Sequence, residues 1–163
     1  MSDIIQGFLP VYDAGSKLLI LGSFPSVKSR EVSFYYGNRQ NKFWKMLAAF
    51  FGQPVGESAD ERRAYILAHK IALWDIVTEC EITGSSDAAI RNYKTADIGL
   101  VLSGADIRLI LCNGKKSYEI FSEKFSGCGV PYRLMPSTSP ANPRYSEAAW
   151  HDALGSVFSR FEG

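Results

Sequence analysis

The sequence predicts an α/β protein, a three-layer α/β/α sandwich around a central four-stranded, mainly parallel sheet. The first observation is a set of four short, near-continuous apolar runs, at residues 17–21, 71–76, 108–112 and 132–135. The second is that helix-like segments separate these runs, over residues 41–51, 60–69, 96–102, 117–125 and 146–160. Unbroken apolar runs are typical of strands buried on both faces, and strands that alternate with helices form parallel sheets.

Turn residues mark where the predicted strands stop. Gly22 and Pro25 follow the first run, Asn113-Gly114 follows the third, and Pro136 follows the fourth. Among the helices, the segment 41–51 carries apolar residues at helical spacing and ends at Gly52. The segments 60–69 and 146–160 begin with acidic residues, which favour a helix N-terminus.

Length and composition predict one compact unit. The chain has 163 residues, 46% of them hydrophobic and 21% charged, with no repeat or linker. We expect a single domain over residues 1–163 that acts as a monomer. The net charge of +1 argues against a broadly basic nucleic-acid coat but leaves room for a local basic face.

Cysteine and histidine usage argues against a metal site. Cys80, Cys112 and Cys128 are odd in number and widely spaced, and neither His69 nor His151 stands beside a cysteine or an acidic cluster. We therefore expect no metal and no cofactor. We assign both histidines to a helix surface or to packing, and not to catalysis. Unpaired cysteines fit a reducing compartment, residues 1–7 lack the features of a signal peptide, and no apolar run is long enough for a membrane span. These features predict a cytoplasmic protein.

Ligands of parallel sheets bind beyond the carboxyl ends of the strands. This rule directs attention to residues 22–26, the loop after Ile76, residues 113–116 and residues 136–142. In the first of these, Gly22-Ser23-Phe24-Pro25-Ser26, the glycine permits close approach of a ligand. Taken alone, this pentapeptide favours an ordinary strand-to-loop turn.

The segment that follows combines cations with flat rings. Between residues 28 and 45 there are five basic side chains and one acidic one, interleaved with aromatic residues. Such a mixture suits a phosphate backbone and a stacked base. We assign Phe43 and Trp44 to the core face of the next helix, and leave a base-stacking role open for Tyr35 or Tyr36.

Two further loops carry polar groups at the same edge. The segment 136–144 contains three prolines and three hydroxyls, so it is suited to grip phosphates or wedge apart stacked bases, or simply to connect two elements. Lys115 and Lys116 stand at a helix start, a weak phosphate signal. Asp75 follows Trp74 within the second run and either caps the next loop or serves in the site. Arg91 and Asn92, in a polar loop beyond that run, either pin the loop to a carbonyl or contact the substrate; composition does not choose between these roles.

Together these segments resemble the uracil-DNA glycosylase superfamily over nearly the whole chain. Residues 22–26 stand at its first motif, Asn41-Lys42-Phe43-Trp44 follows at the spacing of the mismatch-specific branch, and residues 136–140 stand at the second motif, a DNA-intercalating loop. Two positions depart from the uracil branches: Phe24 replaces the Asn or Asp that activates water, and Met135 replaces the His or Asn that supports the departing base. The patterns at 22–26, 34–38 and 87–92 are similar to the hypoxanthine-DNA glycosylase branch.

The resemblance implies a DNA glycosylase of base excision repair that flips deoxyinosine out of DNA and releases hypoxanthine. It implies Asn41 as the catalytic residue and Tyr36 as the stacking aromatic. The expected base-binding residues are Tyr36, Gly22, Ser23, Phe24 and Met135. The expected DNA-binding residues are Ser26, Lys28, Arg39, Lys115, Ser137, Thr138, Ser139, Pro140 and Asn142. Asp75, Arg91 and Asn92 are expected to support the pocket.

The expected partner is damaged double-stranded DNA; whether single-stranded DNA is also a substrate is left open by the sequence. Two alternatives remain open at this stage. One is a uracil- or mismatch-specific glycosylase, and the other is a non-catalytic module that binds DNA or a nucleotide on the same sheet edge.

Overall fold

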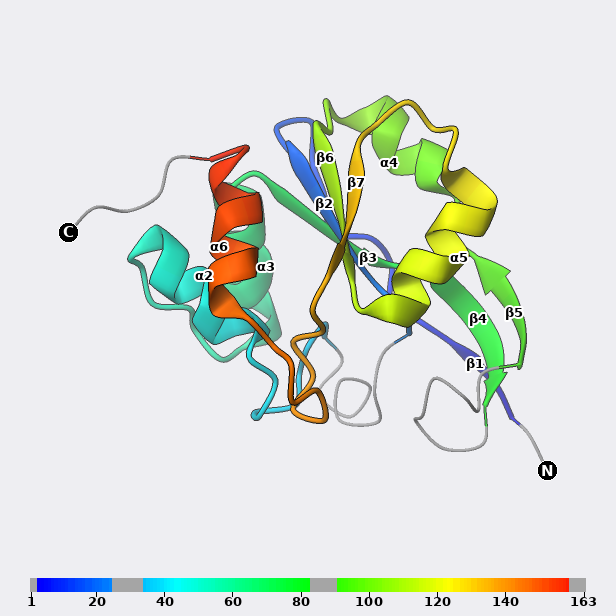
Figure 1. Cartoon of the computed structure of the whole chain (residues 1–163), viewed down its shortest axis with the longest axis horizontal. Coiled ribbons are helices and arrows are strands. Elements are labelled where there is room, and N and C mark those ends of the chain that lie inside the picture. Colours follow the sequence, from blue (N-terminus) through cyan, green and yellow to red (C-terminus); the bar gives the residue numbers. More distant parts are fainter. Residues whose placement is uncertain (1–2, 25–33, 83–90, 159–163) are drawn as a thin grey trace.

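The central feature of the molecule is a parallel sheet of four strands. Figure 1 shows the computed structural model of the chain, which describes residues 3–24, 34–82 and 91–158. The strands are β2 (Leu18–Gly22), β3 (Ile71–Asp75), β6 (Leu109–Asn113) and β7 (Tyr132–Met135). They lie in the order β3-β2-β6-β7, and every pairing is parallel. The sequence prediction of a four-stranded parallel sheet is confirmed.

Helices cover both faces of this sheet (Figure 1). On one face lie α2 (Phe43–Phe51), α3 (Ala59–Ala68) and α6 (Glu147–Gly155); on the other lie α4 (Ile98–Gly104) and α5 (Lys115–Phe125). Successive residues of a strand point to opposite faces, so Leu18 and Ile20 join the first core cluster, and Leu19 and Leu21 join the second. The predicted three-layer sandwich is therefore confirmed. None of the helices in the described ranges is long and apolar enough to cross a membrane.

Several helix boundaries differ from the sequence prediction. The helix expected from residue 41 begins at Phe43, so Asn41 stands before it in a turn. The helix expected from residue 117 begins at Lys115, because Gly114 adopts a φ of 100° and starts the turn earlier. The final helix, expected to reach residue 160, ends at Gly155. The first of these differences matters most, since it leaves the Asn41 side chain free of helical geometry.

A second sheet was not predicted. It is antiparallel, has the order β1-β4-β5, and consists of β1 (Asp3–Gln6), β4 (Val77–Ile82) and β5 (Arg91–Thr95). Its strands lack an unbroken apolar run because charged residues interrupt them, and Glu79 and Lys94 form an ion pair of 3.2 Å between β4 and β5. Arg91 and Asn92 thus belong to a strand, and the prediction that placed them in a loop was wrong.

Candidate functional site

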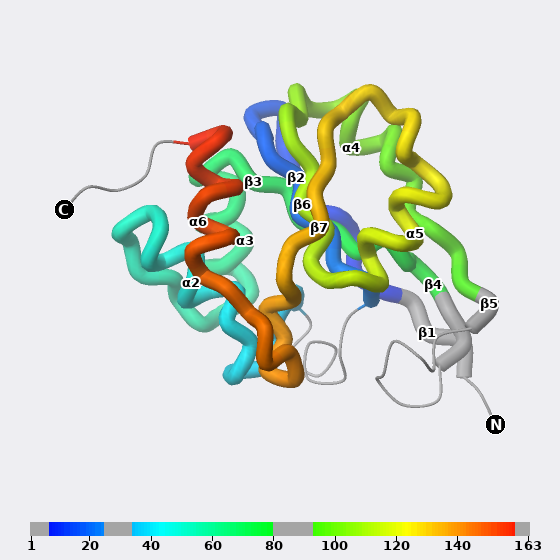
Figure 2. The backbone as a smooth tube through the Cα atoms, viewed as in Figure 1, coloured from blue at the N-terminus to red at the C-terminus, as the bar shows by residue number. Residues whose placement is uncertain are grey.

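The carboxyl ends of the four parallel strands form one edge, as the sequence analysis expected. Gly22 at the end of β2 is in register with Asp75 at the end of β3, and Asn113 at the end of β6 is in register with Met135 at the end of β7. Figure 2 shows that the loop leaving β7 and the segment that leads into α2 run side by side at this edge, where Lys42 N donates to Thr138 O. Residues far apart in the sequence are therefore gathered where a parallel sheet binds its ligands.

Gly22 permits the closest approach at this edge. A Cβ atom at this position would overlap Asp75 Oδ1 and would stand 3.2 Å from Tyr36 Oη. The Asp75 side chain is buried, with 4% of its surface exposed. The backbones of the two strand ends continue in contact beyond the sheet, because Ile76 N donates to Gly22 O at 2.8 Å and Val77 N donates to Ser23 O at 3.0 Å. The absence of a side chain at residue 22 thus makes room for a carboxylate and a phenol at one point.

Tyr36 is held in an unusual backbone conformation. Its φ is 52°, in the left-handed region that non-glycine residues rarely adopt. Its carbonyl accepts a hydrogen bond of 3.1 Å from Trp44 Nε1, and its ring packs on Phe43 with centroids 4.1 Å apart and planes 30° apart. Such backbone strain persists where the surroundings fix it, and it clusters at functional sites.

The Tyr36 hydroxyl is buried beside Asp75. Burial, and then the negative charge of Asp75, raise the pKa of Tyr36 far above its ordinary value, although the Asn113 amide opposes this rise. Among the described residues, Tyr36 Oη has no hydrogen-bond partner of acceptable geometry. The phenol therefore stays protonated at any physiological pH and keeps a proton to donate.

The neighbouring Tyr35 has a structural role. Only 2% of its surface is exposed, and its hydroxyl donates to Leu9 O at 2.7 Å. Its ring lies edge-on to both Phe8 and Phe34. Of the two tyrosines left open on sequence, Tyr36 is the one at the sheet edge.

Asn41 lies just before α2 with its amide orientation fixed. Its Oδ1 accepts a hydrogen bond of 3.0 Å from Phe43 N, and its own backbone N donates to Asn38 O at 2.9 Å. A backbone N–H can only donate, so the atom that faces Phe43 N must be the oxygen. The Nδ2 group of this half-buried side chain is consequently the end that can serve a ligand, as a hydrogen-bond donor.

A pair of hydrogen bonds joins the end of β6 to the loop after β7. Thr138 N donates to Asn113 Oδ1 and Asn113 Nδ2 donates to Thr138 Oγ1, each at 3.0 Å, and both side chains are buried. Thr138 O in turn accepts from Lys42 N at 3.0 Å, one residue after Asn41. We call Asn113 and Thr138 the amide clamp. Asn113 was not among the residues predicted for the site, because on sequence Asn-Gly reads only as a turn.

The rest of the proline-rich loop is stiffened by its own polar groups. Ser139 N donates to Ser137 Oγ at 3.1 Å, Asn142 Nδ2 donates to Ser137 O at 2.9 Å, and Arg144 N donates to Asn142 Oδ1 at 3.0 Å. Trp150 Nε1 of α6 holds Pro136 O at 2.8 Å. The loop is thus a preformed element that projects from the sheet edge.

The other predicted site residues divide by exposure. Phe24 and Met135 are buried in the two core clusters, and Thr138 is fully buried in the amide clamp, so these three side chains face the interior. The exposed ones are Arg39, Lys115 and Pro140. Ser26 and Lys28 lie outside the described residues, as do the side chains of Arg91 and Asn92. Phe43 and Trp44 are core residues, as predicted.

Comparison with known proteins assigns the family. The chain is 36% identical over 152 residues to a hypoxanthine DNA glycosylase of Methanosarcina acetivorans, covering 90% of this chain and 96% of the relative. It is 33% identical over 154 residues to a hypoxanthine DNA glycosylase of Methanosarcina barkeri, covering 91% and 97%. The chain belongs to the hypoxanthine DNA glycosylase family. No family model matches the sequence.

A solved structure confirms the fold of this family member. It is the solution structure of a protein from Methanosarcina acetivorans described as a candidate uracil DNA glycosylase. The two align with a TM-score of 0.80 and 32% identity, over 92% of this chain and 96% of that one. The sequence predictions of a glycosylase of the hypoxanthine branch and of a uracil-DNA-glycosylase-like α/β fold are confirmed.

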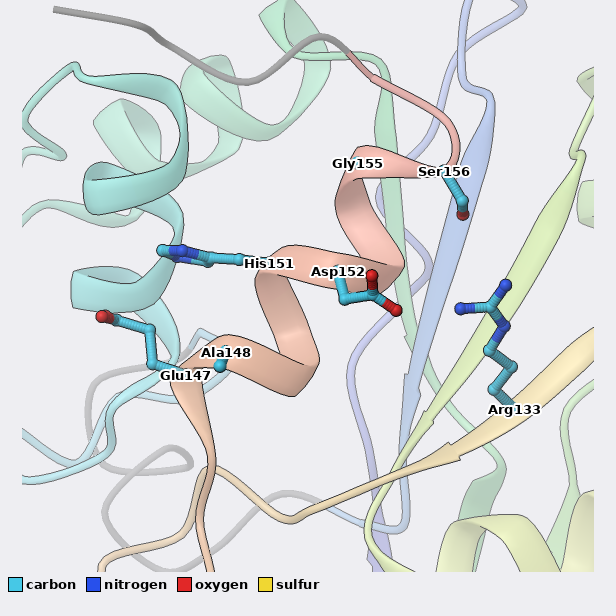
Figure 3. Close-up of a pocket in the computed structure, with 7 residues that line it drawn as sticks. All are labelled: Arg133, Glu147, Ala148, His151, Asp152, Gly155 and Ser156. Atoms are coloured by element: carbon cyan, nitrogen blue, oxygen red, sulfur yellow. The ribbon is translucent and has the colours of Figure 1, made fainter.

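A separate hollow of the glycosylase lies away from the strand ends, between β7 and α6 (Figure 3). Arg133 on the edge strand and Asp152 on the helix face each other across it. His151 also lines it, but its Nε2 is 3.0 Å from Met46 O and its side chain is buried against Phe50. Of the two structural roles left open on sequence, a helix surface or packing, this histidine has the second, and it offers no acid–base group to the strand-end site.

The first prediction concerns the space at residue 22. Gly22→Ala should destabilise the protein by about 1–3 kcal/mol, since the new methyl group must displace Asp75 or Tyr36. Urea denaturation measures the change. Gly127→Ala is the control, because nothing lies within 4 Å of a Cβ there; equal stabilities for the two variants would contradict the packing described.

The second prediction concerns the amide clamp. Asn113→Ala removes both hydrogen bonds to Thr138 and leaves buried groups unsatisfied, so it should cost about 1–3 kcal/mol. Hydrogen exchange should show faster exchange of the Thr138 and Lys42 amides, with the amides of β2 as the internal reference. Unchanged protection at Thr138 would show that the clamp does not hold the loop.

Proposed function

We propose that this chain hydrolyses the N-glycosidic bond of deoxyinosine in DNA, releasing hypoxanthine and leaving an abasic site. Family membership supports the reaction class. The observation that carries the proposal is the placement of Asn41. The next residue, Lys42, donates its backbone N–H to Thr138 O of the preformed loop 136–144, and the bond from Phe43 N to Oδ1 leaves Nδ2 as the end of Asn41 that can donate.

The proposed reaction breaks the bond between C1′ of the deoxyribose and N9 of the base. The bonding electrons leave with the base, the oxygen of a water molecule adds to C1′, and a proton from that water ends on the released hypoxanthine. Because negative charge develops on the leaving base, a fixed hydrogen-bond donor lowers the barrier more than a strong base for water does. The Nδ2 group of Asn41 is such a donor, fixed in advance by the bond from Phe43 N to Oδ1.

Access to the bond requires the nucleotide to leave the duplex. Unstacking costs a few kcal/mol, which stacking and phosphate contacts in the enzyme offset. We assign stacking on the flipped base to Tyr36, whose opposite ring face rests on Phe43, and backbone contacts at the base to Gly22 and Ser23. Phe24 and Met135 shape the pocket from the core beneath.

Contacts to the DNA strand are assigned to the rim of this edge. The exposed Arg39 and Lys115 supply positive charge, and Ser137, Ser139, Pro140 and Asn142 present the stiffened loop to the groove. Thr138 acts from below through the amide clamp. From their sequence positions we also assign contacts to the DNA strand to Ser26 and Lys28. We propose that the enzyme acts as a cytoplasmic monomer on damaged double-stranded DNA.

The substrate assay separates this proposal from its nearest rival. Single-turnover release should be fast from duplexes with deoxyinosine and at least ten times slower from matched duplexes with deoxyuridine, while undamaged duplex stays intact. Faster release of uracil would assign the chain to uracil repair instead. Salt-sensitive DNA binding with no abasic sites from any duplex would make it a non-catalytic binding module.

Replacement of Asn41 tests the catalytic assignment. Asn41→Ala should lower the single-turnover rate on deoxyinosine by about 100- to 1,000-fold, the usual loss for one fixed donor. Asn41→Asp is the matched variant, because a carboxylate still accepts from Phe43 N at the helix start but has lost the Nδ2 donor. It should fold as stably as the parent and lose as much activity as Asn41→Ala. An active Asn41→Asp variant would exclude the donor role.

A further inference from the structure

Asp75 is a buried carboxylate placed where a ligand is expected. It ends β3, directly opposite Gly22 in the register of the sheet, and a side chain at Gly22 would occupy the space of its Oδ1. Burying a carboxylate carries a desolvation cost that the protein must compensate. A charge kept in such a position, at the carboxyl edge of a parallel sheet, is a candidate for function.

The surroundings define what this carboxylate can recognise. Its neighbour Tyr36 Oη stands 3.2 Å from the point where a Gly22 Cβ would lie. Burial and the charge of Asp75 keep the Tyr36 phenol protonated, so the phenol is a hydrogen-bond donor beside the Asp75 side chain. An ionised carboxylate only accepts hydrogen bonds, and it has about four acceptor positions for donors of the protein and of a ligand.

Deamination of adenine to hypoxanthine changes the hydrogen-bonding groups on the edge of the base, and a carboxylate can distinguish the two edges. In adenine, N1 is an acceptor and C6 carries an amino group. In hypoxanthine, N1 carries a hydrogen and is a donor, and C6 carries a carbonyl oxygen. A fixed carboxylate attracts the N1–H of hypoxanthine and repels the N1 lone pair of adenine. A site that depends on such a hydrogen bond strongly rejects a base lacking the donor.

We propose that Asp75 is the base-reading residue of this enzyme, accepting a hydrogen bond from N1–H of the flipped hypoxanthine and thereby excluding adenine. The inference rests on the proposed function and adds a specificity determinant to it. Tyr36 holds the face of the base and Asp75 reads its edge. The two roles are compatible because the Tyr36 hydroxyl and the Asp75 carboxylate converge on one point beside Gly22.

The test compares two bases that differ at N1. Duplexes carry deoxyinosine or deoxynebularine, whose purine has hydrogen at C6 and an unprotonated N1, and single-turnover rates are measured for the parent and for Asp75→Asn. The parent should prefer deoxyinosine. Asparagine can turn its amide to donate to an unprotonated N1, so the ratio of the two rates should fall by about 10- to 100-fold, the worth of one charge-assisted hydrogen bond.

Controls separate recognition from structure and from water activation. Asp97→Asn changes an exposed carboxylate that makes no capping hydrogen bond, and should leave both rates unchanged. If Asp75→Asn slows both bases equally, Asp75 acts on water or on the fold, and the proposal is overturned. The comparison in the parent enzyme does not depend on whether the Asp75→Asn protein folds. If the parent enzyme releases hypoxanthine and purine equally fast, the proposal is overturned without any variant. No release from any duplex would overturn the proposed function itself.

Discussion

The amide clamp between Asn113 and Thr138 is the interaction on which the arrangement of the site depends. Strand ends in a parallel sheet are close together, but the loops that leave them are not thereby fixed. Here one buried asparagine satisfies both the N–H and the hydroxyl of Thr138, and the carbonyl of Thr138 receives Lys42 N. The end of β6, the loop after β7 and the start of α2 are therefore joined at one residue.

This joining explains how a short chain achieves fixed geometry without a metal-binding cluster in the described residues. A donor acts in catalysis only if it is already oriented when charge develops. Asn41 is oriented by Phe43 N, and Phe43 is held by a core that includes Tyr36 and Trp150. Trp150 also fixes Pro136 O at the base of the loop 136–144. The same aromatic cluster thus supports the proposed catalytic amide, the stacking ring and the loop.

The sequence predicted the central sheet well, for a physical reason. Strands buried on both faces largely exclude polar residues, so β2, β3 and β6 stand out as apolar runs. The edge strand β7 is partly exposed and carries Arg133, and its run is the least apolar of the four. The second sheet escaped because β4 and β5 carry charges such as Glu79 and Lys94, which are satisfied across the strands and not by water alone. Asn113 escaped for a related reason: a turn asparagine and a buried clamp look identical until its partner, 25 residues away, is known. A local sequence pattern shows which residues are buried. The hydrogen-bond partners of residues at the sheet edge can be identified only when the order and register of the strands are known.

At two positions the chain departs from the uracil branches, and the structure shows where its polar groups lie instead. Phe24 and Met135 stand where polar residues are expected, and both are buried in the core. The polar groups of the edge lie elsewhere: a carboxylate at the end of β3, an amide before α2, and a second amide at the end of β6. Each is brought to the edge by a different element, so losing polarity at residues 24 and 135 does not leave the edge apolar. For a leaving purine, a donor that stabilises the developing negative charge matters more than a strong base for water. In the proposed reaction Asn41 supplies that donor, and Asp75 is the proposed reader of the base edge.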